Sequence, residues 1–164
     1  MFWGNVSADY DWCEQNYAVT PYIAEFWNCV SSVGIVLAGV YFFRRSRRYC
    51  YGDRFHLASV GVAVIGLGSM LFHGTLQRWG QVLDEVPMLW SSLVFLWIAC
   101  VNAMPAHTVI RCGAMLGWLL CALGTVSTYV YFQGGFTYFI VVYIITVASV
   151  FGAILYRLRD DSPS

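Results

Sequence analysis

The sequence predicts an all-α membrane protein, a polytopic bundle of about five transmembrane helices. Hydrophobic residues make up 59% of the 164-residue chain and charged residues only 11%, whereas an average soluble domain is about 25% charged. A soluble fold of this size cannot bury so much apolar surface, so lipid is the expected solvent for most of the chain. Helices are the expected form, because backbone groups in lipid must bond within their own segment.

Five long apolar runs give the expected helices, at residues 22–43, 57–72, 86–104, 113–132 and 136–155. Crossing the apolar core of a bilayer takes about 17–25 helical residues. Four runs meet this length, and the run at 57–72 meets it only if the helix extends to His73 or beyond. We therefore expect an acidic segment outside the membrane at 1–21, a transmembrane domain at 22–156 and a short tail at 157–164.

The basic residues predict the orientation in the membrane. With five crossings only Arg78 falls on one side, and all the other arginines fall on the opposite side: Arg44, Arg45, Arg47, Arg48, Arg54, Arg111, Arg157 and Arg159. The positive-inside rule makes the eight-arginine side cytoplasmic. The N-terminus and the connection at 74–84 are then lumenal or extracellular. The net charge of zero gives no reason to expect a nucleic-acid partner.

The stretch GSMLFHGTLQRWGQVLDE, residues 68–85, combines titratable groups with an apolar background. Ser69 and His73 share a helix face because they are four residues apart. Asp84 and Glu85 begin the next apolar run after a short connection, so serine, histidine and aspartate can converge. Ionisable groups in membrane segments cost about 2.5–3.5 kcal/mol and usually mark function. The set suits metal-assisted hydrolysis, although zinc needs more than one histidine. Alternatively, His73 ends one helix and Asp84 caps the next.

The segment before the first apolar run is rich in side-chain oxygen. Within eight residues it holds Asp9, Asp11, Glu14, Gln15 and Asn16, and Glu25 follows inside the start of the run. Such oxygen-rich clusters bind hard cations such as calcium, although the spacing is not that of an EF-hand loop. Alternatively, the segment is a solvated acidic head whose carboxylates cap helices. A carboxylate within an apolar run needs a partner, which a bound calcium ion would supply.

Four motifs resemble those of the alkaline ceramidases in order and spacing: DWCEQNY at 11–17, YIAEFWN at 22–28, GLGSMLFHGTLQ at 66–77 and LDEVPML at 83–89. Members of that family are integral membrane hydrolases of the endoplasmic reticulum, Golgi and plasma membrane. They cleave the amide bond of ceramide to give sphingosine and a fatty acid. The resemblance implies a seven-helix fold with an intramembrane zinc ion, of which this chain would form the first five helices.

The resemblance also implies roles for individual residues. His73 would ligate zinc, with Ser69 and Asp84 beside the metal. Asp84 would move a proton from water to the leaving amine, and Ser69 would help to hold either the metal-bound water or the developing oxyanion. A calcium site would be formed by Asp11, the backbone carbonyl of Trp12, Glu14, Asn16 and Glu25.

The chain departs from the family pattern in its histidines. The family carries two further zinc histidines in an H-x-x-x-H motif, whereas this chain has only His56, His73 and His107. His56 and His107 are expected on the opposite membrane face from His73, about 30 Å away. We interpret the chain as a truncated form. The alternative function is that of an inactive membrane protein that binds calcium or lipid or modulates a full-length homologue. A third alternative is another ligand within the wider superfamily of adiponectin-type receptors.

Overall fold

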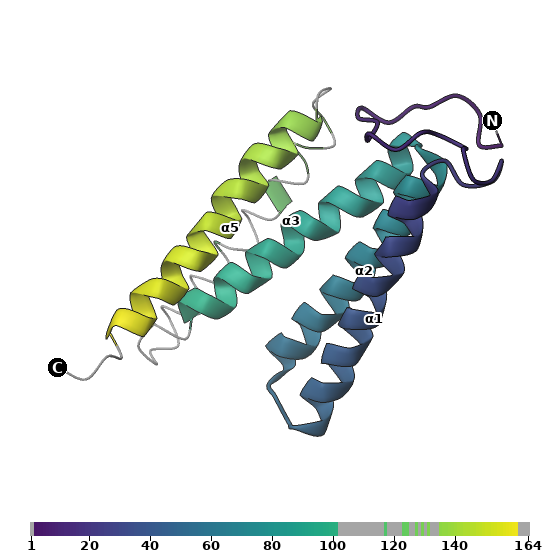
Figure 1. Ribbon diagram of the computed structural model, residues 1–164. Coiled ribbons are helices and arrows are strands. Elements are labelled where there is room, and N and C mark those ends of the chain that lie inside the picture. Colours follow the sequence, from purple (N-terminus) through teal and green to yellow (C-terminus); the bar gives the residue numbers. More distant parts are fainter. Residues whose placement is uncertain are drawn as a thin grey trace. The chain divides into compact units, whose positions relative to one another are not determined.

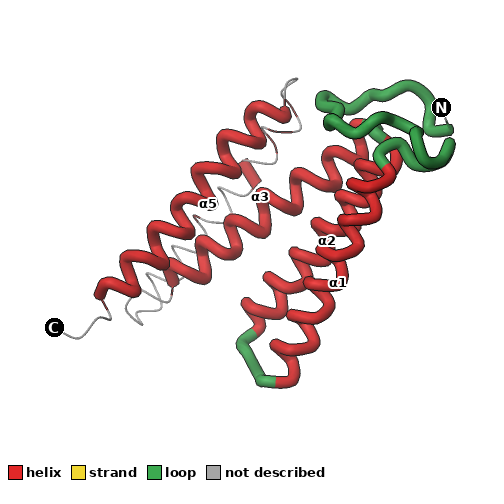
Figure 2. Tube along the Cα trace, viewed as in Figure 1, coloured by secondary structure: helices red, strands yellow, loops and turns green. Residues whose placement is uncertain are grey.

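The computed structural model describes residues 2–101, 117, 123, 124, 127, 129, 131 and 135–160. The named elements in this part are four helices: α1 (Phe26–Arg48), α2 (Asp53–Thr75), α3 (Arg78–Val101) and α5 (Gly135–Asp160) (Figures 1 and 2). Each is long and apolar enough to cross a membrane. The all-α prediction is therefore confirmed, and the chain is an integral membrane protein. The run expected at 113–132 lies mostly outside the described residues.

The chain divides into two compact units, Met1–Met88 and Leu89–Ser164, and the boundary falls within α3. In the second unit, α5 carries large apolar side chains that are mostly exposed, including Ile144, Phe151 and Leu155. Exposed apolar side chains on a helix of this length are typical of a surface that faces lipid. The functional residues predicted from the sequence all lie in the first unit.

Helices α1 and α2 form an antiparallel hairpin and pack along their length (Figure 1). Small residues bring the two backbones close together. A Cβ atom added to Gly39 would lie 2.5 Å from the backbone nitrogen of Ala63, and one added to Gly66 would lie 2.7 Å from that of Val36. Packing of this kind holds membrane helices together, because burial of apolar surface gives little driving force in lipid.

One end of the hairpin, which we call the turn end, comprises residues 41–56. Here α1 continues five residues past its expected end at residue 43, and α2 begins four residues before its expected start at residue 57. The backbone N–H of Tyr49 donates to the Arg45 carbonyl, and that of Tyr51 donates to the Ser46 carbonyl, which closes the last turn of α1. Hydropathy did not predict the last turn of α1 because the turn is rich in arginine. Positive side chains at a helix C-terminus nevertheless stabilise the helix, because they interact favourably with its dipole.

Helix α3 begins earlier than its expected start at residue 86, so that prediction is wrong. Only Leu76 and Gln77 connect α2 to α3, instead of the expected connection at 74–84, and Leu76 makes the turn with a left-handed backbone, φ 50°. Asp84 therefore lies inside α3, so the alternative that it caps this helix is also wrong. The first turn of α3 is polar and resembles a loop in sequence, but Asp9 of the N-terminal segment bonds to Arg78 and Gln81.

The opposite end of the hairpin lies beneath the N-terminal segment, residues 2–25 (Figure 2). We call this region, residues 2–25 with 69–85, the covered end. The backbone N–H groups of Ser7 and Ala8 both donate to the Leu76 carbonyl, at 3.2 Å. Ala24 donates to the Gly74 carbonyl and packs with Phe72 and Leu76 in a small buried cluster. The segment is thus fixed to the helices by both backbone bonds and apolar contacts.

Candidate functional site

Glu25 is the centre of the covered end. It is completely buried, with 0% of its surface exposed, and it occupies the N-cap position of α1 instead of lying inside the helix as expected. Its Oε1 accepts the backbone N–H of Trp12 at 3.0 Å, and its Oε2 is bonded to Nδ1 of His73. The sequence analysis found no protein partner for this carboxylate, and the structure supplies two.

His73 lies in the last turn of α2. Its ring packs against Phe72, with centroids 4.9 Å apart, and lies 6.4 Å from the ring of Trp12. Because Glu25 engages Nδ1, the second ring nitrogen, Nε2, is the one left for a ligand. A carboxylate on the far nitrogen is the usual environment of a metal-binding histidine, because it fixes the tautomer and the ring orientation.

Ser69 and Asp84 are both buried near His73. A Cβ atom on Gly68 would lie 2.0 Å from the Leu83 carbonyl oxygen and 3.0 Å from the Asp84 Cα, so α2 and α3 almost touch there. This contact holds the backbone at Asp84 against the end of α2 that carries His73. The structure therefore brings the three residues to one end of the helices, although no hydrogen bond joins them in the described part of the chain.

The residues expected to bind calcium surround the start of α1. The Glu14 carboxylate accepts the backbone N–H groups of Trp27 and Asn28, at 2.8 and 3.0 Å, and so caps the first turn of the helix. The side-chain N–H of Asn16 donates to Asp11 at 2.8 Å. The Oδ1 atom of Asn16 is buried and has no hydrogen-bond partner among the described residues.

The two metals that the resemblance implies fit these residues unequally. Within the described ranges, no group of three or more His, Cys, Asp or Glu side chains could hold a metal ion. Calcium, however, also accepts amide and backbone oxygens, and the unpartnered Asn16 Oδ1 is an atom that a hard cation would satisfy. The expected calcium donors are therefore of the chemical type that this ion accepts, but the carboxylates of Asp11, Glu14 and Glu25 are not gathered into one metal-holding group.

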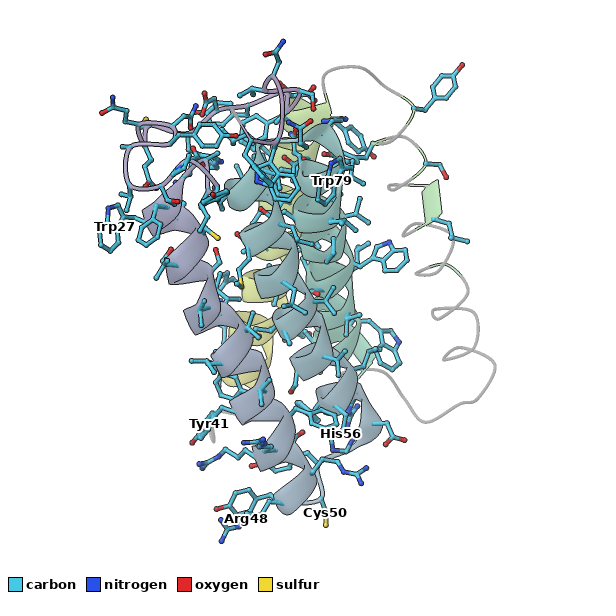
Figure 3. The ribbon with its side chains drawn as sticks, turned by 90° about the vertical axis from the view of Figure 1, so that its right-hand side faces the viewer. Trp27, Tyr41, Arg48, Cys50, His56 and Trp79 are labelled. Carbon is cyan, nitrogen blue, oxygen red and sulfur yellow. The ribbon has the colours of Figure 1, made fainter. Side chains whose placement is uncertain are left out.

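Zinc has one expected ligand at the covered end, which is His73. His56 lies at the opposite end of α2, with Arg48 and Cys50 (Figure 3), about 26 Å away at 1.5 Å per residue. This confirms that His56 and His73 lie at opposite ends of the hairpin, and His107 lies outside the described residues. The part of the chain that the structure describes thus brings one imidazole to the covered end, so we derive no reaction step through zinc.

Sequence reasoning missed several residues that build the covered end. Gln81 is fully buried; it accepts the Asp9 backbone N–H and donates to Glu85, both at 2.8 Å. Arg78 forms an ion pair with Asp9. On α1, the hydroxyl of Ser32 lies 3.1 Å from the Ser69 hydroxyl. The sequence did contain one signal for the ion pair. Arg78 is the single arginine expected on the same side of the membrane as the acidic N-terminal segment.

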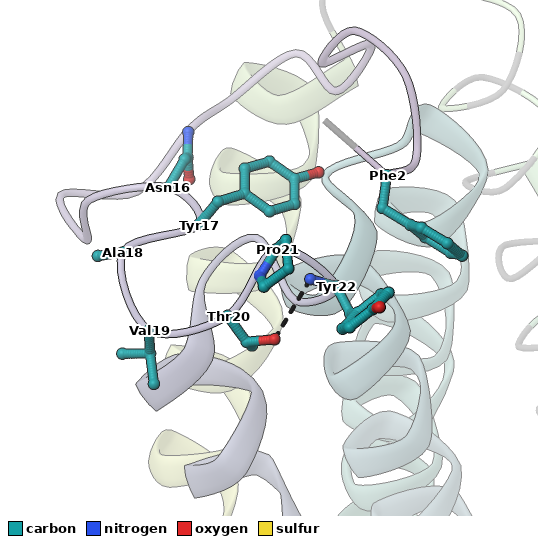
Figure 4. Close-up of a pocket in the computed structure, with 8 residues that line it drawn as sticks. All are labelled: Phe2, Asn16, Tyr17, Ala18, Val19, Thr20, Pro21 and Tyr22. Carbon is teal, nitrogen blue, oxygen red and sulfur yellow. Dashed lines mark hydrogen bonds between the residues drawn. The ribbon is translucent and has the colours of Figure 1, made fainter.

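A cavity of about 710 Å³ lies within the N-terminal segment, lined by Phe2 and residues 16–22 (Figure 4). Thr20 accepts the backbone N–H of Tyr22 at 3.4 Å in its wall. Burial raises the pKa of the Tyr17 phenol above its ordinary value. This cavity is separate from the predicted catalytic group, because neither His73 nor its neighbours line it.

Comparisons with known proteins agree with the resemblance in the motifs. The sequence model of the family described as Ceramidase matches residues 4–163. Alkaline ceramidase YPC1 of Saccharomyces cerevisiae is 32% identical over 174 residues, covering 97% of this chain and 54% of the relative. Alkaline ceramidase 3 of Mus musculus is 38% identical over 96 residues, 58% of this chain and 36% of the relative. An alkaline ceramidase of Arabidopsis thaliana is 38% identical over 97 residues, 59% of this chain and 38% of the relative. The chain thus spans about half or less of the length of these relatives.

Proposed function

Because this chain belongs to the ceramidase family, we propose that it serves in the hydrolysis of the amide bond of ceramide or a related sphingolipid, which yields sphingosine and a fatty acid. The observation that carries the proposal is the buried carboxylate of Glu25 bonded to His73, with the buried residues Asp84 and Ser69 at the same end of the helices. Buried titratable groups between membrane helices are costly and usually functional.

The proposed roles follow from the contacts of each residue. His73 would hold zinc through Nε2, while Glu25 fixes the ring from Nδ1. A zinc ion held there would supply Lewis-acid chemistry for hydrolysis of an amide. Asp84 would accept a proton from the attacking water and deliver it to the leaving amine. Ser32 can donate to the Ser69 hydroxyl, which frees the Ser69 proton to stabilise the developing oxyanion.

Calcium has a supporting role in this proposal. It would be held by Asp11, the Trp12 carbonyl, Glu14, Asn16 and Glu25. Since Glu25 also bonds to His73, an ion at this site would hold the carboxylate in place and so fix the histidine. Calcium would therefore support hydrolysis without touching the substrate.

The proposed location is a membrane of the endoplasmic reticulum or Golgi, with the N-terminus in the lumen and the C-terminus in the cytoplasm. The support is the distribution of arginine. The turn end carries Arg44, Arg45, Arg47, Arg48 and Arg54, whereas the covered end carries Arg78, and the positive-inside rule places the richer side in the cytoplasm.

The test is release of sphingosine and fatty acid from ceramide by the full chain in lipid nanodiscs supplied with zinc and calcium. We expect Asp84→Asn and His73→Ala to lower the rate at least about 100-fold, which is the usual contribution of a positioned acid–base group. His56→Ala, the matched histidine control at the turn end, should keep the rate of the unmodified chain. An unmodified chain without activity, or a His73→Ala variant that keeps it, would contradict the proposal.

A second candidate function is that of a membrane protein that binds calcium without catalysis. The observation that favours it is the single imidazole at the covered end. Metal analysis of the purified chain separates the two candidates. Stoichiometric calcium without zinc, together with no release of fatty acid, supports the second, whereas stoichiometric zinc supports the first.

A further inference from the structure

The turn end carries a concentrated positive charge, and four of its arginines have no carboxylate partner in the part of the chain that the structure describes. Five arginines lie within residues 44–54, and the single carboxylate of this stretch, Asp53, is fully exposed and lies 3.5 Å from His56. Among the described residues, no carboxylate lies within ion-pair distance of Arg44, Arg45, Arg47 or Arg48. By contrast, Arg78 at the covered end is paired with Asp9. All four unpaired arginines are exposed.

Aromatic side chains contact one of these arginines, Arg45. The guanidinium of Arg45 donates to the Tyr41 hydroxyl at 3.1 Å and lies over the Tyr49 ring, 5.2 Å from its centre. Tyr49 in turn stacks on Tyr51, with ring centres 6.2 Å apart. These contacts hold the guanidinium in place and leave its other N–H groups available. Arginine beside exposed tyrosine is typical of the membrane–water interface.

The position of the group follows from the two helices that carry it. Both α1 and α2 are candidate membrane spans, and the turn between them is short. The arginines therefore lie at the level of the lipid headgroups (Figure 3 shows Tyr41, Arg48, Cys50 and His56 together at this end). In the same turn α2 begins at Asp53, and its N-cap residue, Gly52, provides no side-chain cap, so the first amides of the helix add to the positive potential.

We propose that Arg44, Arg45, Arg47 and Arg48 bind the headgroups of anionic phospholipids in the adjacent leaflet. Guanidinium groups bind phosphate and carboxylate oxygens through paired hydrogen bonds. Basic clusters directly next to a membrane span are attracted to anionic lipid. Depth in the membrane favours a lipid over a soluble acidic protein, because the cluster and its aromatic neighbours continue directly from two lipid-facing helices. The proposal does not rest on the hydrolase function.

The experiment uses the full chain in nanodiscs of equal parts phosphatidylcholine and phosphatidylserine, with native mass spectrometry of the lipids that stay bound. We expect phosphatidylserine to be enriched, and the enrichment to fall with rising salt. In Arg47→Gln/Arg48→Gln it should fall at least about fivefold, because one basic residue near an anionic surface is worth a factor of about five. This variant keeps three arginines at the turn end, which preserves the charge bias that orients the helices.

Two controls isolate the charge and the place. Arg47→Lys/Arg48→Lys, which keeps the charge, should retain most of the enrichment, and Arg78→Gln at the covered end should leave it unchanged. If the glutamine pair does not fold, Arg44→Gln is measured in its place. Equal retention of both lipids by the unmodified chain, or full enrichment in a folded glutamine variant, would overturn the proposal. Binding of soluble poly-glutamate without any lipid preference would instead indicate an acidic protein partner and equally overturn it.

Discussion

The two ends of the α1–α2 hairpin satisfy their charges in opposite ways. At the covered end, Glu25 is buried against His73, and Asp9 is paired with Arg78. At the turn end Arg44, Arg45, Arg47 and Arg48 are exposed, and Arg45 contacts the side chains of Tyr41 and Tyr49 instead of a carboxylate. The difference teaches that charge in a membrane protein has two separate uses. Charges that are paired within the protein form a structured site. Charges that remain exposed instead orient the chain in the membrane and are available to interact with molecules around it.

The strongest test of this comparison removes the buried carboxylate. Glu25→Ala removes a completely buried carboxylate and leaves His73, whose side chain is 12% exposed, and the Trp12 N–H without their partner, so we expect a loss of about 3–5 kcal/mol in the free energy of unfolding. Unfolding in mixed micelles with calcium chelated measures the effect of the protein contacts alone. Asp53→Ala, which removes an exposed carboxylate beside a histidine at the turn end, should give no measurable change. Equal effects at the two ends would break the comparison.

Calcium should distinguish the two ends by a somewhat smaller amount. At a calcium concentration about 100 times its dissociation constant, the unmodified chain should gain about 2.7 kcal/mol of stability. Asn16→Ala should reduce that gain, because it removes the buried Oδ1 that lacks a partner. Thermal unfolding with and without a chelator provides the measurement, and hydrogen exchange should place the protection in the N-terminal segment. A gain that persists in Asn16→Ala would remove this residue from the calcium site.

Close packing should also matter at one end only. Gly68→Ala places a Cβ atom 2.0 Å from the Leu83 carbonyl oxygen, so α2 and α3 must separate, at a cost of about 1–3 kcal/mol. Gly52→Ala at the turn end meets no atom within 4 Å and has an ordinary φ of −63°, so it should change stability by less than about 0.5 kcal/mol. Chemical unfolding of the two variants side by side checks both values. A neutral Gly68→Ala would mean that Asp84 is not held against α2.

The sequence predicted the helices better than it predicted their ends. Long apolar runs identify membrane spans because backbone groups in lipid must form their hydrogen bonds within the protein. Hydropathy does not detect a polar helical turn whose side chains form hydrogen bonds with another segment of the chain. The turn that carries Arg78 and Gln81 was therefore predicted to be a loop, whereas in the structure both side chains form hydrogen bonds with Asp9. In the same way, the helical spacing of Ser69 and His73 was readable. The partnership of Glu25 with His73 was not, because it joins residues far apart in sequence and depends on how the N-terminal segment folds back.

The smallest expected effect concerns the outer edge of the covered end. Asp9 and Arg78 are about one-third exposed, and partly exposed ion pairs usually contribute about 0.2–1 kcal/mol. Asp9→Asn should therefore lower global stability only slightly. It should nonetheless increase hydrogen exchange at Ser7 and Ala8, because their bonds to the Leu76 carbonyl depend on the same docking.

High salt offers a second measurement of the same pair, since salt screens exposed charges. We expect high salt to increase exchange at Ser7 and Ala8 in the unmodified chain and to have little effect in Asp9→Asn. If exchange there is unchanged by both salt and substitution, backbone bonds and the apolar cluster alone hold the segment. Charge neutralisation at the covered end would then be confined to the pair formed by the buried Glu25 and His73, and the contrast with the turn end would rest on that pair.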